Sequence, residues 1–178
     1  MLHLDTISIE KVSFKNLLKA EKFLFEQCKL HYGNKITPLR YEELRLRLQK
    51  EMQRDDHAMF IAQTRDEKVV GCITLSCYDD RIDAIKGRYA KGSALEVSRC
   101  YVDNNYRRRG IGSLLFDKVC AFAKELDYEM LYLHTHYFLP GGFNFWNAVG
   151  FTITLEEGGS WQTVHMERYV EEEAVCYA

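Results

Sequence analysis

The order of the predicted elements indicates an α/β or α+β protein in which helices cover a mixed sheet. Strand-like and helix-like segments follow one another as β-α-α-β-β-β-α-β-α-β-β. Two neighbouring strand-like segments around residues 58–78 also predict a hairpin. The length of 178 residues suits one domain, so we expect a single domain over 1–178 with an exposed tail at 171–178.

The first three elements rest on hydrophobic spacing and on one helix-start signal. Residues 4–12 alternate between two faces and predict a strand, and the apolar residues of 14–28 follow helical spacing. Thr37 and Pro38 supply an N-cap and a first-turn proline for a second helix, whose apolar stripe runs to Met52.

The central segments predict a hairpin, a loop and a further strand. Residues 58–63 and 69–78 are strand-like and are joined by a polar turn at 64–68. The polar segment 79–93 predicts a loop, and 95–102 predicts the next strand.

The C-terminal half continues with two helices and three strands. An apolar stripe of 3.6-residue period predicts a helix over 113–126, and a strand follows at 130–136. A short helix is expected at 140–149, and strands are expected at 151–155 and 161–170.

Composition argues against several classes of protein. Lys and Arg total 24 against 26 for Asp and Glu, a formal net charge of −2, whereas a general nucleic-acid binder is usually strongly basic. No apolar run approaches the roughly 18 residues of a membrane span, and the first residues lack the features of a signal peptide. The six cysteines form no CxxC pair, which favours reduced thiols over a disulfide framework. We therefore expect a cytoplasmic protein that binds neither nucleic acid nor membrane.

The stretch YVDNNYRRRGIG at 101–112 joins a predicted strand to a predicted helix. Helix N-termini present unpaired N–H groups and partial positive charge, and glycine lets an anion approach the backbone. Arginine adds charge-assisted contacts to phosphate. The stretch therefore predicts a pyrophosphate site, with a solvated basic turn as the alternative.

Two other phosphate motifs fit this stretch less well. A nucleotide P-loop needs four residues between its glycines and a following lysine, but only one residue separates Gly110 from Gly112. The dinucleotide fingerprint GxGxxG requires a third glycine at the position where this sequence has Leu115. Glu129 does lie about where a ribose-binding acid would.

The residues RRRGIG at 107–112 resemble the acetyl-CoA-binding motif of the GCN5-related N-acetyltransferases (GNAT). The segment FWNAVGF at 145–151 resembles a second signature of that family. The resemblance is specific over 95–151 and rests on element order elsewhere. It implies a mixed, mostly antiparallel sheet of about seven strands flanked by about four helices. It also implies a β-bulge in the fourth strand, and fourth and fifth strands that splay apart around the pantetheine arm of acetyl-CoA.

The resemblance further implies a set of cofactor-binding residues. The backbone of residues 100–102 would hold the pantetheine and the acetyl carbonyl, and the N–H groups of residues 108–112 would hold the pyrophosphate. The full expected set is Cys100, Tyr101, Val102, Arg107, Arg108, Arg109, Gly110, Ile111, Gly112, Ser113 and Trp146.

Glu96 is the candidate catalytic residue, because it lies six residues before Val102 and matches the general base of histone-type family members. An amine acceptor is mostly protonated at neutral pH and must lose a proton before it attacks. Glu96 would take that proton directly or through water. The alternatives are a charge that positions the acceptor and an ordinary salt-bridged surface glutamate.

Four residues are candidates for the acceptor side: Tyr78, Asp79, His134 and His136. The acidic loop would attract a cationic amine, unless it is only solvated. The two histidines share one face of a strand. Ordinary hydrogen bonding at the sheet surface is the alternative for them, and a zinc site lacks a third ligand nearby.

Trp146 departs from the family pattern, because many members carry a tyrosine there that protonates the leaving thiolate. Tryptophan can pack on pantetheine but is no practical acid. Water or another tyrosine, such as Tyr137, would then protonate the thiolate.

The sequence therefore predicts an enzyme that moves the acetyl group of acetyl-CoA to a primary amine by direct attack in a ternary complex, without a metal. The sequence does not identify the acceptor, which is a small molecule or a peptide. It also does not decide between a monomer and a homodimer. The alternatives are a non-catalytic acyl-CoA-binding or sensing domain on the same fold and a nucleotide-binding module.

Overall fold

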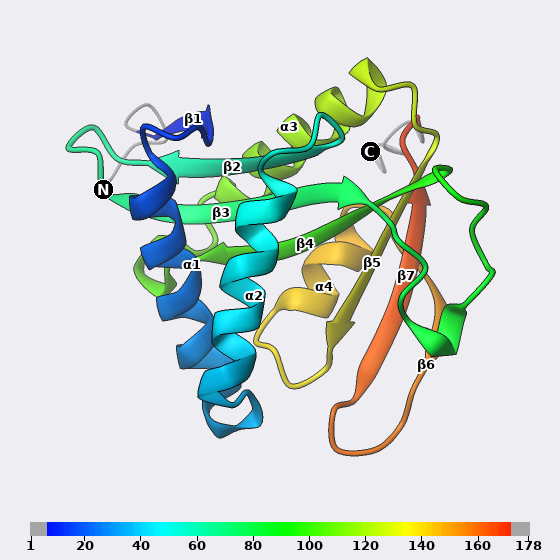
Figure 1. Cartoon of the computed structure of the whole chain (residues 1–178). Coiled ribbons are helices and arrows are strands. Elements are labelled where there is room, and N and C mark those ends of the chain that lie inside the picture. The colour runs from blue at the N-terminus through cyan, green and yellow to red at the C-terminus, as the bar shows by residue number, and fades with distance from the viewer. Residues whose placement is uncertain (1–6, 172–178) are drawn as a thin grey trace. The chain divides into compact units, whose positions relative to one another are not determined.

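The computed structural model describes residues 7–171, and within them the chain forms seven strands and four α-helices in the predicted order (Figure 1). The predicted fold class is confirmed. Residues 4–6 of the predicted first strand and residues 172–178 of the predicted tail lie outside the described residues. The elements are β1 (Ser8–Lys11), α1 (Leu17–Tyr32), α2 (Pro38–Glu51), β2 (His57–Gln63), β3 (Val69–Cys77), β4 (Ala94–Val102), α3 (Ile111–Glu125), β5 (Met130–His136), α4 (Gly142–Ala148), β6 (Thr152–Glu156) and β7 (Thr163–Tyr169).

The strands form one mixed sheet in the order β1-β2-β3-β4-β5-β7-β6. Strands β1, β2 and β3 pair in antiparallel fashion, as do β5, β7 and β6. Strands β4 and β5 run parallel, and their ladder joins Ala94–Glu96 to Met130–Tyr132. Both strands extend beyond this three-residue ladder, β4 to Val102 and β5 to His136.

By its internal contacts the chain divides into two compact units. The first unit takes the residues up to Ser76 together with Arg99–Val119, and the second takes Cys77–Ser98 and the residues from Cys120 onward. Strand β4 and helix α3 each contribute residues to both units.

In the first unit, α1 and α2 cover one face of β2 and β3 (Figure 1). The side chain of Thr37 accepts a hydrogen bond from the amide of Arg40 at 3.2 Å, so the predicted cap of α2 is confirmed. The core beneath these helices contains Val12, Ala20, Phe23, Leu24, Cys28, Leu48, Met59, Ile61, Val69 and Cys72.

The start of α3 packs closely on β3 in the same unit. A Cβ added at Gly71 would lie 3.1 Å from Cδ1 of Leu115 and 3.2 Å from Cγ2 of Ile111. Glycine therefore lets the first turn of the helix approach the strand. This contact sets where the N-terminus of α3 lies relative to β3.

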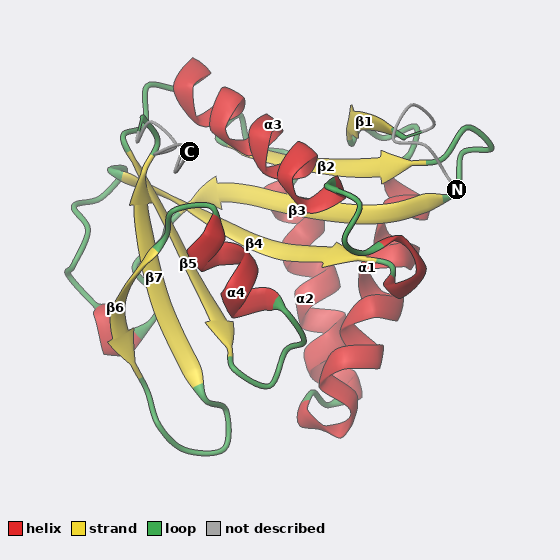
Figure 2. Ribbon diagram, turned by 180° about the vertical axis from the view of Figure 1, so that it is seen from behind, coloured by secondary structure: helices red, strands yellow, loops and turns green. Residues whose placement is uncertain are grey.

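In the second unit, β5, β7 and β6 form an antiparallel group, and α4 lies over β5 (Figure 2). The loop between β3 and β4 brings Tyr78 and Ile85 into a small core with Ala94 and Tyr132. Burial of this loop's apolar side chains ties the start of β4 to the middle of β5.

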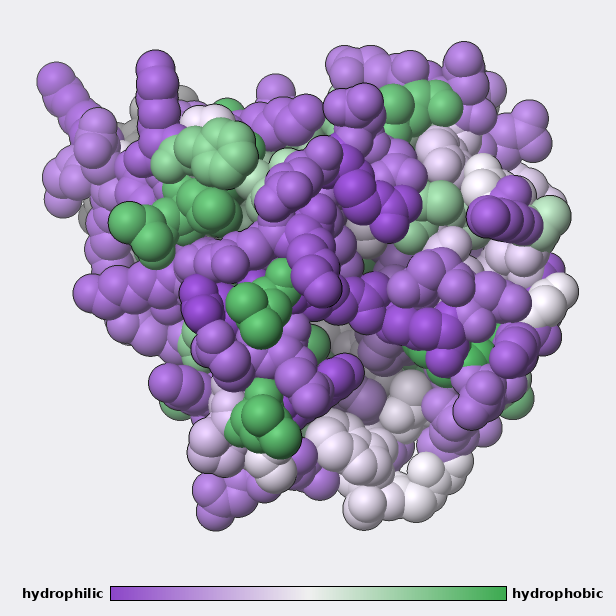
Figure 3. Space-filling view, viewed as in Figure 1, coloured by the Kyte–Doolittle hydropathy of each residue, from purple (hydrophilic) through white to green (hydrophobic). Residues whose placement is uncertain are grey.

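The face that carries α1 and α2 is mostly hydrophilic, with separate apolar patches (Figure 3). Five large apolar side chains of this part of the chain are exposed: Phe14, Leu18, Leu30, Leu39 and Leu46. Scattered apolar side chains are ordinary on protein surfaces. Among the helices of residues 7–171, none combines the length and apolarity that crossing a membrane requires.

Candidate active site

The arginine–glycine loop is a left-handed turn that ends at a helix start. The side chain of Asp103 accepts a hydrogen bond from the amide of Asn105 at 2.9 Å, and Nε of Arg107 donates to the carbonyl of Val102 at 3.1 Å. Arg108 and Gly110 then take φ values of +57° and +78°. These contacts hold the loop against the end of β4.

The N-terminus of α3 presents backbone amides at this loop. Leu114 donates its amide to the carbonyl of Gly110 at 3.0 Å, and helix geometry leaves the amides of Ile111, Gly112 and Ser113 without partners inside the helix. Such amides, with the positive end of the helix dipole, form an anion site.

Arg109 adds an unsatisfied donor to the same loop. Its guanidinium lies over the ring of Tyr106, 5.3 Å from the centroid. Its Nη1 atom is buried, and among residues 7–171 it has no hydrogen-bond partner. A buried guanidinium nitrogen without an acceptor is costly, so a phosphate group would satisfy a donor that the protein leaves open.

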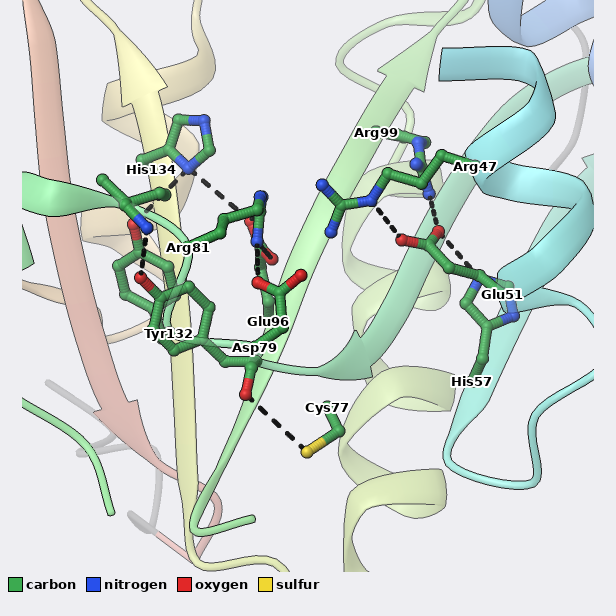
Figure 4. A network of polar contacts seen from close by, with 12 residues as sticks. Arg47, Glu51, His57, Cys77, Asp79, Arg81, Glu96, Arg99, Tyr132 and His134 are labelled. Atoms are coloured by element: carbon green, nitrogen blue, oxygen red, sulfur yellow. Dashed lines mark hydrogen bonds and ion pairs between the residues drawn. The ribbon is translucent and has the colours of Figure 1, made fainter. Parts of the chain in front are cut away.

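Strand β4 is interrupted at Arg99, which takes a left-handed φ of +51°. A carboxylate from α2 supports this residue, because Nη1 of Arg99 donates to Oε2 of Glu51 at 2.7 Å and Nε of Arg47 donates to Oε1 at 2.7 Å. Figure 4 shows both arginines converging on Glu51. The conformation breaks the regular extended backbone just before the predicted pantetheine segment.

Residues 100–102, predicted to hold the pantetheine, follow this interruption at once. The hydroxyl of Tyr101 accepts a weak hydrogen bond from Sγ of Cys28 at 3.6 Å. Burial raises the pKa of the Cys100 thiol to about 12, so Cys100 stays protonated at neutral pH. The described cysteines Cys28, Cys72, Cys77, Cys100 and Cys120 form no disulfide, and Cys176 lies outside the described residues.

Glu96, the predicted base, lies on β4 in the second unit with 2% of its surface exposed. Both of its carboxylate oxygens accept hydrogen bonds from Arg81, at 2.7 and 2.8 Å (Figure 4). Arg81 also donates to Asp79 at 2.9 Å. Burial lowers the pKa of Arg81, but the hydrogen bonds and charges of Glu96 and Asp79 outweigh that effect and raise it overall.

His134 lies beside this ion pair. Its Nδ1 atom is 3.6 Å from Oε1 of Glu96 and 3.4 Å from the hydroxyl of Tyr132. Burial is the main cause that lowers the pKa of His134 to about 4; Glu96 opposes this shift, and Arg81 adds to it. His134 is therefore neutral at physiological pH, and the structure brings together Glu96 and His134 of the predicted set.

The contacts continue from Tyr132 to β7. The hydroxyl of Tyr132 lies 2.8 Å from Nδ1 of His165, and Nε2 of His165 lies 2.8 Å from Oε2 of Glu157. Burial raises the pKa of Tyr132 above its ordinary value, and the charge of Glu96 raises it further. The phenol therefore stays protonated.

The other predicted acceptor residues have structural contacts of their own. Tyr78 is buried, and its hydroxyl accepts a hydrogen bond from the amide of Ile82 at 3.3 Å. His136 is buried as well, with Nδ1 3.0 Å from Oγ1 of Thr163. Asp79 is the more exposed of these candidates, and it is bound to Arg81.

Trp146 is buried in the second unit and packs edge-to-face on Phe145 and Phe151, with ring centroids 4.9 and 5.4 Å away. Its contacts there are those of a core side chain. Within residues 7–171, no group of three or more His, Cys, Asp or Glu side chains could hold a metal ion.

A depression of about 550 Å³ lies elsewhere in the second unit. Its lining residues are Lys124, Asp127, Tyr128, Glu129, Tyr169 and Glu171. None of the predicted site residues is among them.

Sequence reasoning missed Arg81, Tyr132, His165 and Glu157. Period-two alternation along β5 places Tyr132 on the same face as His134, and this signal could have found it. His165 lies in the strand predicted at 161–170, where nothing marks it as a site residue. Its contact with Tyr132, 33 residues away, is not encoded in any local pattern.

Solved acetyltransferases share the fold of this chain. A GNAT acetyltransferase from Staphylococcus aureus Mu50 superposes with a TM-score of 0.73 at 19% identity, covering 93% of this chain and 99% of its own. PaiA N-acetyltransferase from Thermoplasma acidophilum, solved with coenzyme A, gives 0.69 at 21% identity, covering 92% and 99%. YncA from Salmonella typhimurium, solved with acetyl-CoA, gives 0.68 at 15% identity, covering 95% and 96%.

The sequence comparison identifies the family. Residues 20–151 match the model of the acetyltransferase (GNAT) family, and no curated protein matches the chain. Because the match covers well over half of the chain and contains the glycine loop, the chain belongs to the acetyltransferase (GNAT) family.

Proposed function

We propose that this protein transfers the acetyl group of acetyl-CoA to a primary amine by direct attack within a ternary complex. The observation that carries the proposal is the loop at 107–113. It combines the amides of a helix N-terminus with a buried Arg109 Nη1 atom that has no acceptor among residues 7–171. That set of donors suits a pyrophosphate.

Binding of acetyl-CoA is assigned to two neighbouring segments of the first unit. The amides of residues 108–112 hold the pyrophosphate, and the backbone of 100–102 holds the pantetheine and acetyl carbonyl. The left-handed residue Arg99 supports this assignment, because it interrupts β4 immediately before residue 100. Bound acetyl-CoA supplies the thioester that the amine attacks.

Glu96 acts as the base in this proposal, directly or through a water molecule. Each carboxylate oxygen carries a second lone pair beyond the one that Arg81 occupies, so Glu96 can still accept a proton from an ammonium group or a water. The ion pair with Arg81 orients the carboxylate, and Asp79 adds negative charge that favours a cationic acceptor.

Direct attack is favoured over a covalent acetyl-cysteine intermediate. The nucleophilic form of cysteine is the thiolate, and burial keeps Cys100 protonated with a pKa of about 12. Burial also raises the pKa of Cys28 and of Cys72. The thiols near the predicted pantetheine segment are therefore poor nucleophiles. The absence of disulfides among the five described cysteines also supports a reducing, cytoplasmic setting.

A thiol-release screen tests the function. The protein is incubated with acetyl-CoA and a panel of small amines, amino acids and peptides, while calorimetry measures CoA binding. Amine-dependent release of CoA is the expected result. CoA binding without release for any amine would instead support an acyl-CoA-binding or sensing role, and nucleotide binding without CoA binding would contradict the assignment of the loop.

A further inference from the structure

A chain of polar side chains runs through the second unit from the candidate site to a surface glutamate. It begins at His134 and passes through Tyr132 and His165 to Glu157, with successive distances of 3.4, 2.8 and 2.8 Å. Figure 4 shows its first part, where His134 lies above Tyr132 and beside Glu96. The four residues come from β5, from β7 and from the segment after β6.

With both imidazoles neutral, the chemistry of the last member sets the direction of every hydrogen bond. An ionised carboxylate only accepts, so Nε2 of His165 carries the proton that Glu157 receives. Nδ1 of a neutral His165 is then an acceptor, and the hydroxyl of Tyr132 donates to it. The oxygen of Tyr132 in turn accepts from Nδ1–H of His134. This leaves Nε2 of His134 as the bare nitrogen at the start of the chain.

The two end members of this chain of side chains are partly exposed to solvent, and its two middle members are buried. The side chain of His134 is 30% exposed and that of Glu157 is 43% exposed. Tyr132 and His165 between them are 0% and 1% exposed. A proton that enters at His134 can therefore leave at Glu157 without meeting solvent on the way.

The proposed reaction needs such an outlet. An ammonium acceptor carries three protons on nitrogen and the amide product keeps one, so two protons leave in each turnover. One ends on the thiol of CoA, and the other must reach the solvent. Glu96 can accept one of the two protons that leave the nitrogen, so the reaction needs a second proton acceptor at the site.

We propose that His134 accepts the second proton of the reaction and that Tyr132, His165 and Glu157 relay it to the surface. The inference rests on the proposed acetyltransferase function. Nε2 of His134 takes a proton from the acceptor nitrogen or from a water bound to it, and its Nδ1 proton moves to the oxygen of Tyr132. The hydroxyl proton of Tyr132 moves to Nδ1 of His165, and the Nε2 proton of His165 moves to Glu157. Glu157 then releases one proton to solvent, so charge and protons balance.

The surroundings of His134 suit a group that passes a proton on. Glu96 from β4 and Arg81 from the preceding loop face it, as do His136 on its own strand and His165 on β7. Burial, with Arg81 and both histidines, lowers the pKa of His134 to about 4 against the opposing effect of Glu96. An imidazolium at this position is therefore short-lived at pH 7, and a hydrogen-bonded outlet gives its proton a path other than return to the amine.

Nitrogen-15 NMR of histidine-labelled protein tests the direction of the relay without any activity. At pH 7 we expect His134 as the Nδ1–H tautomer and His165 as the Nε2–H tautomer. Finding His134 with its proton on Nε2, or His165 with its proton on Nδ1, would overturn the relay. This result stands even if the wild-type protein shows no acetyl transfer, which would contradict the proposed function separately.

Kinetics of Glu157→Gln test whether the relay carries protons. Glutamine still accepts from His165 but cannot take up a proton at neutral pH, so we expect kcat to fall by about tenfold or more with an unchanged KM for acetyl-CoA. Added imidazole buffer should restore part of the loss at this exposed end. The matched control, Glu125→Gln on the exposed end of α3, should leave kcat unchanged. A Glu157→Gln enzyme within twofold of wild type at low buffer concentration would refute the relay.

Discussion

Arg81 donates to both carboxylate oxygens of Glu96, at 2.7 and 2.8 Å, although the two residues belong to different segments of the second unit. Glu96 is 2% exposed, and a buried carboxylate without a partner would be strongly unfavourable. Arg81 therefore stabilises the buried negative charge of Glu96 on β4.

Glu96→Gln keeps the shape of the side chain and removes the proposed base. Turnover should fall by about 10²–10³, the usual scale for loss of a general base, while CoA affinity changes little. Steady-state kinetics from pH 6 to 9 and calorimetry provide the measurements. Recovery of turnover in Glu96→Gln at high pH would support the role of Glu96 as a base, because free amine is then abundant. A loss of less than threefold across that range would exclude the role.

Arg81→Gln should destabilise the fold, because it leaves Glu96 buried without its bidentate partner. We expect the free energy of unfolding in urea to fall by about 3 kcal/mol, the cost of removing one member of a buried pair. The double variant Arg81→Gln/Glu96→Gln should recover much of this loss. Equal losses in the single and double variants would mean that the pair does not stabilise the protein.

Gly110→Glu should weaken CoA binding by about 100-fold or more. The φ of +78° disfavours any side chain, and the new carboxylate would repel the pyrophosphate. Calorimetry measures the affinity, which in wild type should also decrease with added salt. Gly87→Glu is the matched control, since Gly87 has a φ of +76° and open space around it. Equal CoA affinity in Gly110→Glu and wild type would remove the motif assignment.

Trp146→Tyr should raise turnover by less than about tenfold, far below the 10²–10⁴ of a well-placed acid. The side chain is buried against Phe145 and Phe151. A thiolate leaves readily without an acid, because the reference pKa of a thiol is about 8.5. Trp146→Phe should act chiefly through lost packing area in the core, seen as a lower free energy of unfolding. A larger gain in Trp146→Tyr would show that protonation of the thiolate limits the reaction.

The stability of the fold should decrease as the pH falls from 6.5 to 4, partly through His57. Burial is the main cause that lowers the pKa of His57 to about 4 from 6.5, despite the opposing charge of Glu51. In this window the unfolded chain binds a proton that the folded chain does not, so the free energy of unfolding rises with pH by up to about 3 kcal/mol. NMR titration should give an imidazole midpoint near 4. A midpoint above 6 would contradict the prediction, and His57→Gln should flatten the pH dependence of urea unfolding.

Local patterns predicted the helices and strands well, because the pattern that indicates each element lies in neighbouring residues. The predicted strand at 130–136 matches β5 at both ends, and the Thr37–Pro38 start of α2 is confirmed with its cap. The loop at 107–112 was also found from adjacent letters, since an anion site at a helix N-terminus needs only a strand end, glycines and a helix start in sequence.

The polar partners of the site could not be predicted in this way. Arg81 lies 15 residues from Glu96, and Tyr132 lies 33 residues from His165. Which side chains meet depends on the strand order and on the register that pairs His134 with His165. Likewise, the family resemblance implies a β-bulge in the fourth strand, but no local pattern places a left-handed residue at Arg99, because arginine rarely takes that conformation without support.

By itself, the sequence determined the succession of elements, the glycine loop and the family, because spacing, caps and motifs act over a few residues. Tertiary structure decided what the candidate base and its neighbours contact. The buried charge of Glu96 requires a partner that only the folded loop before β4 can bring, and the relay from His134 to Glu157 requires β5 and β7 side by side. Burial then lowers the pKa of His134, since desolvation arises only once the strands have packed.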